Sequence, residues 1–124
     1  MRYMITLRVT DMPGTPPSAD LMEAIAKLGE EATRSGALLD TAGLAPSSEG
    51  ARITLTGGAL NVMDGPFAEA KELISYSLFE VRSKEEALEW TSRFLKIHRD
   101  HWKGWEGEAD VLRVMGPEDF AAPE

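Results

Sequence analysis

The segment Leu73-Ile-Ser-Tyr-Ser-Leu-Phe-Glu-Val-Arg-Ser-Lys-Glu-Glu86 (LISYSLFEVRSKEE) joins the strongest strand signal of the chain to its clearest helix start. Residues 73–82 alternate between two sets of side chains, as in a β-strand, where successive side chains point to opposite faces. Both sets contain apolar groups, so the pattern predicts a central strand that is covered on both sides. Ser83 followed by Glu86 is a capping-box pattern, which predicts that a helix begins here.

The helix that follows Ser83 has one apolar side. The residues on this side recur at helical spacing and are Ala87, Trp90, Phe94 and His98. We expect Gly104 or Gly107 to end this segment and residues 110–115 to form the last strand. Residues 116–124 are predicted to be a short, mobile acidic tail.

The N-terminal part of the chain adds two strands with a helix between them. The predicted strands are residues 2–10 and 37–44. The helix is bounded by Ser18 as its N-cap and by Gly36 just beyond its end. Its apolar stripe consists of Leu21, Ile25, Leu28 and Ala32.

A hairpin is predicted between the two halves of the chain. Residues 51–56 and 59–63 have strand character and are separated by Gly57-Gly58, which suits a tight turn that requires positive φ angles. The predicted order is then strand, helix, strand, hairpin, strand, helix, strand. This order indicates an α+β fold with both helices on one face of the sheet. Because no third helix remains to cover the other face, we expect a homodimer that packs sheet on sheet.

The composition limits the possible functions. The chain has 124 residues, enough for one domain, which we place at residues 1–115. Its formal net charge is −8, so neither nucleic acid nor an acidic membrane surface is an expected partner. It has no cysteine, which excludes disulfides and thiolate catalysis and suggests a reducing cytoplasm. No apolar run approaches the roughly 18 residues of a membrane helix.

A distinctive run lies between the hairpin and the next strand. It reads Asp64-Gly-Pro-Phe-Ala-Glu69 and is followed by Lys71 and Glu72. Together with the strand and capped helix after it, this run resembles the DGPF-domain proteins of the YCII-related family, and the resemblance covers nearly the whole chain. It implies a ferredoxin-like, dimeric α/β-barrel fold in a cytoplasmic homodimer. It also implies a small-molecule pocket with a His and an Asp.

The chain departs from this family pattern at positions that matter for catalysis. Its first helix contains no histidine, so the expected His and Asp pair is absent in that form. Ala70 stands where Thr is usual. Ser75 and Ser77 flank Tyr76 where Gly and a second Tyr are typical. These differences weaken any transfer of catalysis from the family to this chain.

Asp64 has two interpretations. As a catalytic group, it would be a general acid or base at the end of a strand. As a turn residue, which we favour, its carboxylate would accept backbone N–H groups, while Gly65 and Pro66 shape the turn. A turn does not require Phe67, which we predict to be a buried anchor or the wall of a ligand pocket. We place Tyr76 near that pocket, but we favour core packing with a satisfied hydroxyl over presentation of the hydroxyl to a ligand.

The two histidines, His98 and His101, are three residues apart and would share one face of a continuing helix. A zinc site would need a third ligand such as Glu106 or Glu108, and nearby Lys and Arg side chains disfavour a cation, so we expect no metal. No P-loop, nucleophile elbow or Gly-x-Gly-x-x-Gly pattern is present, and we expect no organic cofactor.

These observations predict a homodimeric domain that binds a small organic molecule between the sheet and the helices. If the domain is an enzyme, the predicted chemistry is proton transfer on a small ring or carbonyl compound, with Asp64 as the base and His98 as the acid. The alternative is a non-catalytic protein-interaction module. The family resemblance links that alternative to transcriptional regulation, because relatives occur beside sigma-factor genes.

Overall fold

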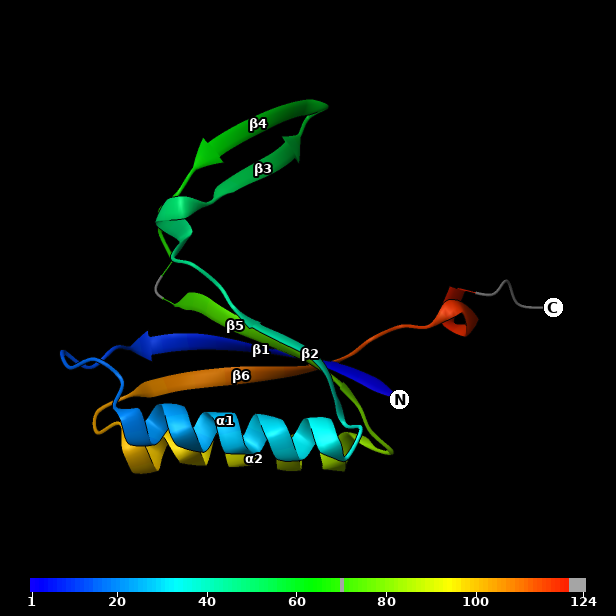
Figure 1. The fold of residues 1–124 in the computed structure, drawn as a ribbon. Helices are drawn as coiled ribbons and strands as arrows, with labels where there is room; N and C mark the ends of the chain where they lie inside the picture. Colours follow the sequence, from blue (N-terminus) through cyan, green and yellow to red (C-terminus); the bar gives the residue numbers. More distant parts are fainter. Residues whose placement is uncertain (70, 121–124) are drawn as a thin grey trace.

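The structure, a computed structural model, describes residues 1–69 and 71–120, and its strands and helices are arranged as Figure 1 shows. In chain order the elements are β1 (Arg2–Asp11), α1 (Ala19–Arg34), β2 (Leu38–Gly43), β3 (Ala51–Thr56), β4 (Ala59–Asp64), β5 (Glu72–Glu80), α2 (Lys84–His101) and β6 (Glu106–Arg113). Two short 3₁₀ turns complete the described chain: η1 (Ser47–Glu49) and η2 (Pro117–Phe120).

Four strands form one antiparallel sheet in the order β2-β5-β1-β6. Both helices lie against one face of this sheet (Figure 1). The connectivity is that of a ferredoxin-like fold with the β3-β4 hairpin inserted between the second and third strands of the sheet. The predicted α+β class and the central position of β5 are therefore confirmed.

The core lies between the helices and the sheet because β1 alternates strictly between buried and less buried residues. The buried residues are the odd-numbered ones: Tyr3, Ile5, Leu7 and Val9. From the helices, Ala32 of α1 and Ala87 of α2 pack into the same core. Phe79 of β5 stacks on Trp90 of α2 with their ring centroids 6.2 Å apart.

Within residues 1–69 and 71–120, no α-helix covers the other face of the sheet (Figure 1). Directly opposed residues of antiparallel strands share a face, so the pairs assign this face to the even-numbered residues of β1 and their partners. We call it the open face, and its members include Met4, Thr6, Arg8, Tyr76, Leu78, Glu108, Asp110 and Leu112. The prediction that β5 is covered on both sides is thus met on one side only within this chain.

Both helix starts follow the predicted capping chemistry. The Ser18 hydroxyl accepts a hydrogen bond from the Leu21 N–H at 3.1 Å, and the Ser83 hydroxyl accepts one from the Glu86 N–H at 3.1 Å. The Glu86 carboxylate accepts the N–H of Arg82, one residue before the N-cap, rather than that of Ser83 itself. None of the helices in residues 1–69 and 71–120 is both long and apolar enough for a membrane span.

The boundaries near the C-terminus differ from those predicted. Helix α2 ends at His101, earlier than Gly104, whose φ of 87° places it in the turn after the helix. Strand β6 begins at Glu106, four residues before the predicted start. Its first residues have low strand propensity, but they pair with the end of the long β1, and this tertiary pairing overrides local preference.

The predicted acidic tail begins with an ordered turn. Asp119 in η2 accepts two hydrogen bonds from the guanidinium of Arg113, at 2.9 and 3.1 Å, and one from the Gly116 N–H. The bond from Arg113, followed by that from Gly116, holds the pKa of Asp119 below its usual range. Residues 121–124 of the predicted tail lie outside the described residues.

The predicted hairpin is confirmed as β3 paired with β4. Gly57 and Gly58 have φ angles of 59° and 79°, which glycine adopts without the steric cost that a side chain would add. The hairpin stands away from the sheet on the side opposite the helices (Figure 1).

Replacing the N-cap residue of α2, Ser83→Ala, is expected to lower the free energy of unfolding by about 1 kcal/mol, because the Glu86 N–H loses its acceptor. Urea unfolding followed by circular dichroism measures this change. Ser92→Ala, at an exposed position inside the same helix, is the control and should be neutral or slightly stabilising. Equal losses in the two variants would contradict the assigned cap.

Candidate functional site

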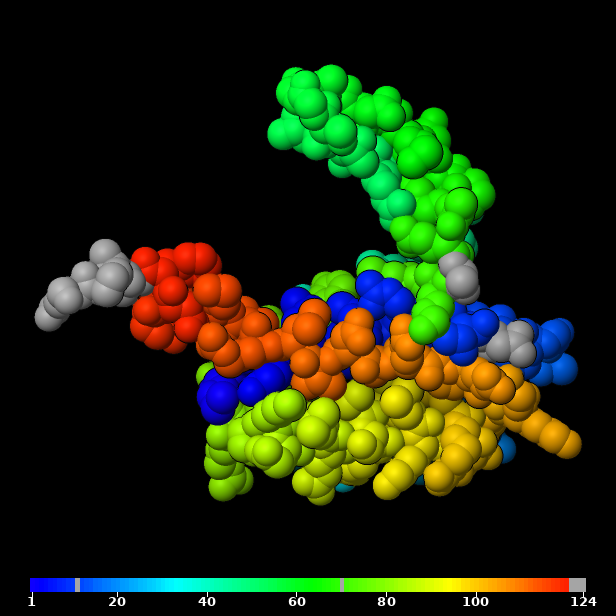
Figure 2. All heavy atoms as spheres, turned by 180° about the vertical axis from the view of Figure 1, so that it is seen from behind, coloured from blue at the N-terminus to red at the C-terminus, as the bar shows by residue number. Residues whose placement is uncertain are grey.

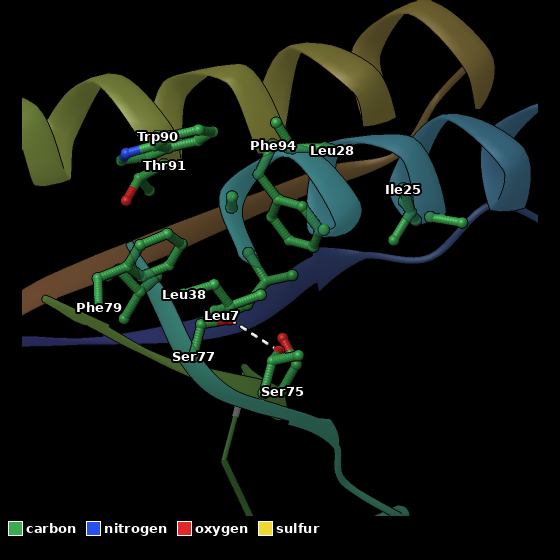
Figure 3. A pocket seen from close by; sticks show the side chains of 15 residues that line it. Leu7, Ile25, Leu28, Leu38, Ser75, Ser77, Phe79, Trp90, Thr91 and Phe94 are labelled. Atoms are coloured by element: carbon green, nitrogen blue, oxygen red, sulfur yellow. Dashed lines mark hydrogen bonds between the residues drawn. The ribbon is translucent and has the colours of Figure 1, made fainter. Parts of the chain in front are cut away.

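A cleft of about 270 Å³ lies between the two helices and the sheet (Figure 3). Its apolar walls come from α1, α2 and the inner face of the sheet. The residues on these walls include Ile25 and Leu28 of α1, Trp90 and Phe94 of α2, and Leu7, Leu38 and Phe79 of the sheet. Gly29 and Ala32 also line it, and their small size leaves the space unfilled.

One edge of the cleft carries hydroxyl groups from β2 and β5. These belong to Thr41, Ser75 and Ser77. The hydroxyls of Thr41 and Ser77 are 2.9 Å apart, and that of Thr41 is also 2.9 Å from the Tyr76 carbonyl oxygen. Ser75 and Ser77, together with Thr41, therefore supply the polar edge of an otherwise apolar cleft.

No described residue that lines the cleft has an ionisable side chain. Thr91, the remaining hydroxyl in the lining, already donates to the Ala87 carbonyl at 2.8 Å. A charged ligand would lose its hydration here without gaining an opposite charge, which is costly. The cleft therefore suits a small neutral molecule that can form a hydrogen bond at one end.

A second crevice, of about 460 Å³, lies near the base of the hairpin and contains Phe67. The guanidinium of Arg52 lies 4.0 Å from the centre of the Phe67 ring and pairs with Glu69 at 2.6 Å. The other cations in its lining are also paired: Arg8 with Asp110 and Lys71 with Glu108. Because each of these cations is already paired, this crevice has less to offer an anionic ligand, despite its larger volume.

Asp64 is the last residue of β4 and lies opposite Ala51, exposed to solvent. In the part of the chain that the structure describes, its side chain forms no hydrogen bond and lines neither the cleft nor the crevice. Neither Asp64 nor Phe67 lies in the cleft. The predicted carboxylate-to-backbone bonds of the turn are not observed within this part either.

Other side chains hold the turn in place, and local sequence patterns did not indicate them. The Glu72 carboxylate accepts hydrogen bonds from the Ser47 N–H and hydroxyl, and the Ser47 hydroxyl accepts one from the Phe67 N–H. The Gly65 N–H donates to the Gly50 carbonyl at 2.9 Å. The only sequence signal was the polarity of Ser47 in the loop after β2, far from its partners in the chain.

Tyr76 lies on the open face, away from the cleft. Its hydroxyl donates to the Asp40 carboxylate at 3.0 Å, and this bond raises the pKa of Tyr76 above its usual value. The strand alternation explains its position, because Ser75 and Ser77 on either side point towards the helices. Tyr76 thus has the satisfied hydroxyl of the favoured prediction, but at a partly exposed position rather than in the core.

His98 is buried in the core, with 5% of its surface exposed. Its ring packs between Phe94 and Trp105, with centroids 4.7 and 4.5 Å away. The Nδ1 atom lies 2.9 Å from the Phe94 carbonyl, and since a carbonyl only accepts, Nδ1 carries the proton. Burial lowers the pKa of His98, and the bond to Phe94 opposes this in part.

His98 therefore differs from His101, which is exposed at the end of α2. His98 does not line the cleft, and its surroundings are those of a core residue. Among residues 1–69 and 71–120, no group of three or more His, Asp or Glu side chains is placed to hold a metal ion.

In a chain whose core must keep His98 neutral, acid should destabilise the fold. Below pH 6.5, the ordinary pKa of the group, the unfolded chain binds a proton that the folded chain does not. The free energy of unfolding should fall by up to about 1.4 kcal/mol per pH unit until the lower folded pKa is reached. His98→Phe should remove this component, as measured by urea unfolding between neutral and mildly acidic pH.

The exposed histidine supplies the control for this experiment. His101→Gln should keep the acid sensitivity of the original chain, because its imidazole is not buried. The same pH profile for His98→Phe and the original chain would show that burial of His98 does not couple folding to protonation.

The turn at Gly65 has no room for a side chain. A Cβ atom there would lie 1.7 Å from the Ser47 carbonyl oxygen, so Gly65→Ala should displace the base of the hairpin. We expect faster amide hydrogen exchange across residues 51–64 and, where the strain reaches the sheet, a loss of about 1–3 kcal/mol. Gly50→Ala is the matched control, since its Cβ would meet the same oxygen at an ordinary 3.6 Å. Unchanged exchange in Gly65→Ala would contradict this constraint.

Comparisons with known proteins identify the family of this chain but do not indicate an activity. No curated protein matches the chain. Among solved structures, an amidase of the hydantoinase/carbamoylase family from Burkholderia phymatum is similar, at 18% identity and a TM-score of 0.31. The match covers 93% of this chain but only 28% of the amidase chain, and so low a TM-score supports no argument about fold or function. The YCII-related domain, by contrast, matches residues 1–104, and the chain belongs to the YCII-related family.

Proposed function

We propose that this domain binds a small, neutral, largely apolar molecule in the cleft between the helices and the sheet. The observation that carries the proposal is the composition of the cleft: apolar walls and a cluster of hydroxyls at one edge, with no ionisable side chain among the described lining residues. Such a combination is typical of ligand sites, where apolar area provides affinity and a few polar groups orient the ligand.

The same lining favours binding over proton-transfer catalysis. General acid–base chemistry needs a titratable group within hydrogen-bond reach of the substrate. Asp64 is exposed at the end of β4, and His98 is buried between Phe94 and Trp105. With neither residue in the lining, we propose that the cleft holds its ligand without transferring protons through this pair.

We also propose that the domain forms a homodimer through the open face. This face exposes apolar side chains, among them Leu112 at 55%, beside half-buried Met4 and Leu78. Its cations are paired within the chain, as Arg8 is with Asp110 at 2.9 Å, and the Asp40 carboxylate accepts the Tyr76 hydroxyl. Two such faces could therefore pack sheet on sheet with their cations already paired inside each chain.

The cleft is tested by filling it from Gly29. A side chain at this position of α1 would enter open space, because a Cβ there has no neighbour within 4 Å. Gly29→Leu should fill the cleft and, by raising helix propensity, should not destabilise the fold. The probes are benzyl alcohol and benzoate, a neutral and an anionic molecule of similar size. Binding is followed by chemical-shift changes of backbone amides in ¹⁵N-labelled protein.

In the original chain, benzyl alcohol should shift the amides of Ser75, Ser77 and Phe94 more strongly than benzoate does. Gly29→Leu should abolish these shifts, whereas Gly29→Ala, which leaves most of the space open, should keep them. The proposal fails if benzyl alcohol produces no localised shifts, or if the shifts persist in a folded Gly29→Leu variant. Equal binding of benzoate would contradict the preference for a neutral ligand.

A further inference from the structure

The hairpin has one face that is apolar and exposed beyond its base, where Asp64 lies opposite Ala51. In β3 and β4, Ile53 lies opposite Val62 and Leu55 lies opposite Leu60, and opposed residues share a face. These four side chains are 65–73% exposed. We call them the arm face.

The opposite face of the same hairpin is mostly polar. It carries Thr54 opposite Asn61 and Arg52 opposite Met63. Such alternation is expected of a strand pair with one buried side, but in this chain nothing among the described residues covers the apolar side. A free two-stranded hairpin is only marginally stable, and a contiguous apolar patch of this kind marks a binding surface.

The hairpin projects from the open face of the sheet. It rises on the side opposite the helices, and in the space-filling view it curves away from the body with only its base in contact (Figures 1 and 2). A molecule bound to the open face would therefore lie beside the hairpin. One partner could cover both surfaces.

We propose that the arm face binds a second copy of this chain, so that two hairpins embrace a dimer whose open faces are packed together. This inference rests on the homodimer proposed above and adds to it the surface that completes the contact. In a two-fold dimer each copy supplies one arm and receives the other, so both apolar surfaces are covered by a single symmetric arrangement.

The charge distribution selects a second copy over a partner of opposite charge. The chain has a net charge of −8, yet residues 53–63 contain no charged side chain. Two copies repel each other through their acidic surfaces but not through this segment or through the internally paired charges of the open face. A basic partner would be expected to dock on acidic groups, whereas the four side chains of the arm face are all aliphatic.

The size of the arm face also requires the sheet as part of the interface. Full burial of an aliphatic side chain corresponds to roughly 60–120 Å² of buried area, which is its transfer free energy divided by about 25 cal/mol per Å². Four such side chains therefore bury less than about 500 Å². A stable complex buries about 800 Å² on each partner. The arm face alone is too small, and the adjoining open face has to contribute the rest.

The test compares two pairs of substitutions that add the same charge to opposite faces of the hairpin. Leu55→Glu with Leu60→Glu alters the arm face, and Thr54→Glu with Asn61→Glu alters the polar face of the same strands. Light scattering and sedimentation at micromolar concentration should show the original chain at twice the mass of one chain. The arm-face pair should raise the dimer Kd roughly a hundredfold or more, and the polar-face pair less than about fivefold.

The outcomes separate the arm from the homodimer itself. A monomeric original chain overturns both. If the original chain is a dimer and the arm-face pair leaves it intact, the contact of the arm face with the second copy is refuted, while the sheet-to-sheet homodimer stands. Equal weakening by both pairs also overturns the arm, because it would reflect added charge rather than a contact of one face.

A mixing experiment then locates the arm. The chain has no cysteine, so Ala59→Cys at the hairpin turn carries a single spin label and leaves the arm face unmodified. This protein is mixed with a ¹⁵N-enriched copy that carries no spin label. The amide resonances of β1, β5 or β6 in the enriched copy should then broaden. A mixed dimer without such broadening would refute contact between the arm and the second copy.

Discussion

The structure depends on the position of β1, which pairs with β5 on one side and β6 on the other. Its side chains at positions 3, 5, 7 and 9 point to the helices, and antiparallel pairing then decides which side chains of its neighbours point the same way. A slip of one residue would turn every side chain of a strand to the opposite face. The register of this strand therefore assigns Ser75 and Ser77 to the cleft and Tyr76 to the open face.

The cleft follows from the sizes of the side chains that this register brings together. Gly29 and Ala32 of α1 and Ser75 and Ser77 of β5 all line the cleft, so small side chains come from both the helix and the sheet. Large groups such as Trp90 flank the space without filling it (Figure 3). Protein cores are otherwise packed to the density of organic crystals, so a gap between small residues on both sides is a specific feature of this chain.

The two faces of the sheet therefore have different chemistry. The inner face, with the helices, forms an apolar space with a hydroxyl edge. The outer face holds paired charges, such as Arg8 with Asp110, and the bond between Tyr76 and Asp40. The hairpin extends from the outer side. We therefore assign ligand binding to the inner side and association to the outer side, with the sheet as the rigid layer between them.

Local chemistry along the chain determined much of this architecture. The caps at Ser18 and Ser83 and the turn at Gly57-Gly58 depend on neighbours a few residues away, so their patterns are legible in the sequence. The periodicity of each segment is also local, and the resulting order of strands and helices predicted the α+β fold. The Asp64-Gly-Pro-Phe67 run identified the family but did not mark the site.

The tertiary structure decided what depends on residues far apart in the chain. It extended β6 by pairing its weak first residues with β1, and it fixed the turn through Ser47 and Glu72. It also buried His98 away from the cleft. Periodicity shows that a strand has two faces, but only pairing and packing determine which face meets the helices. For this reason the sequence alone determined the elements of the protein, and only the tertiary structure decided where its cleft and its open surfaces lie.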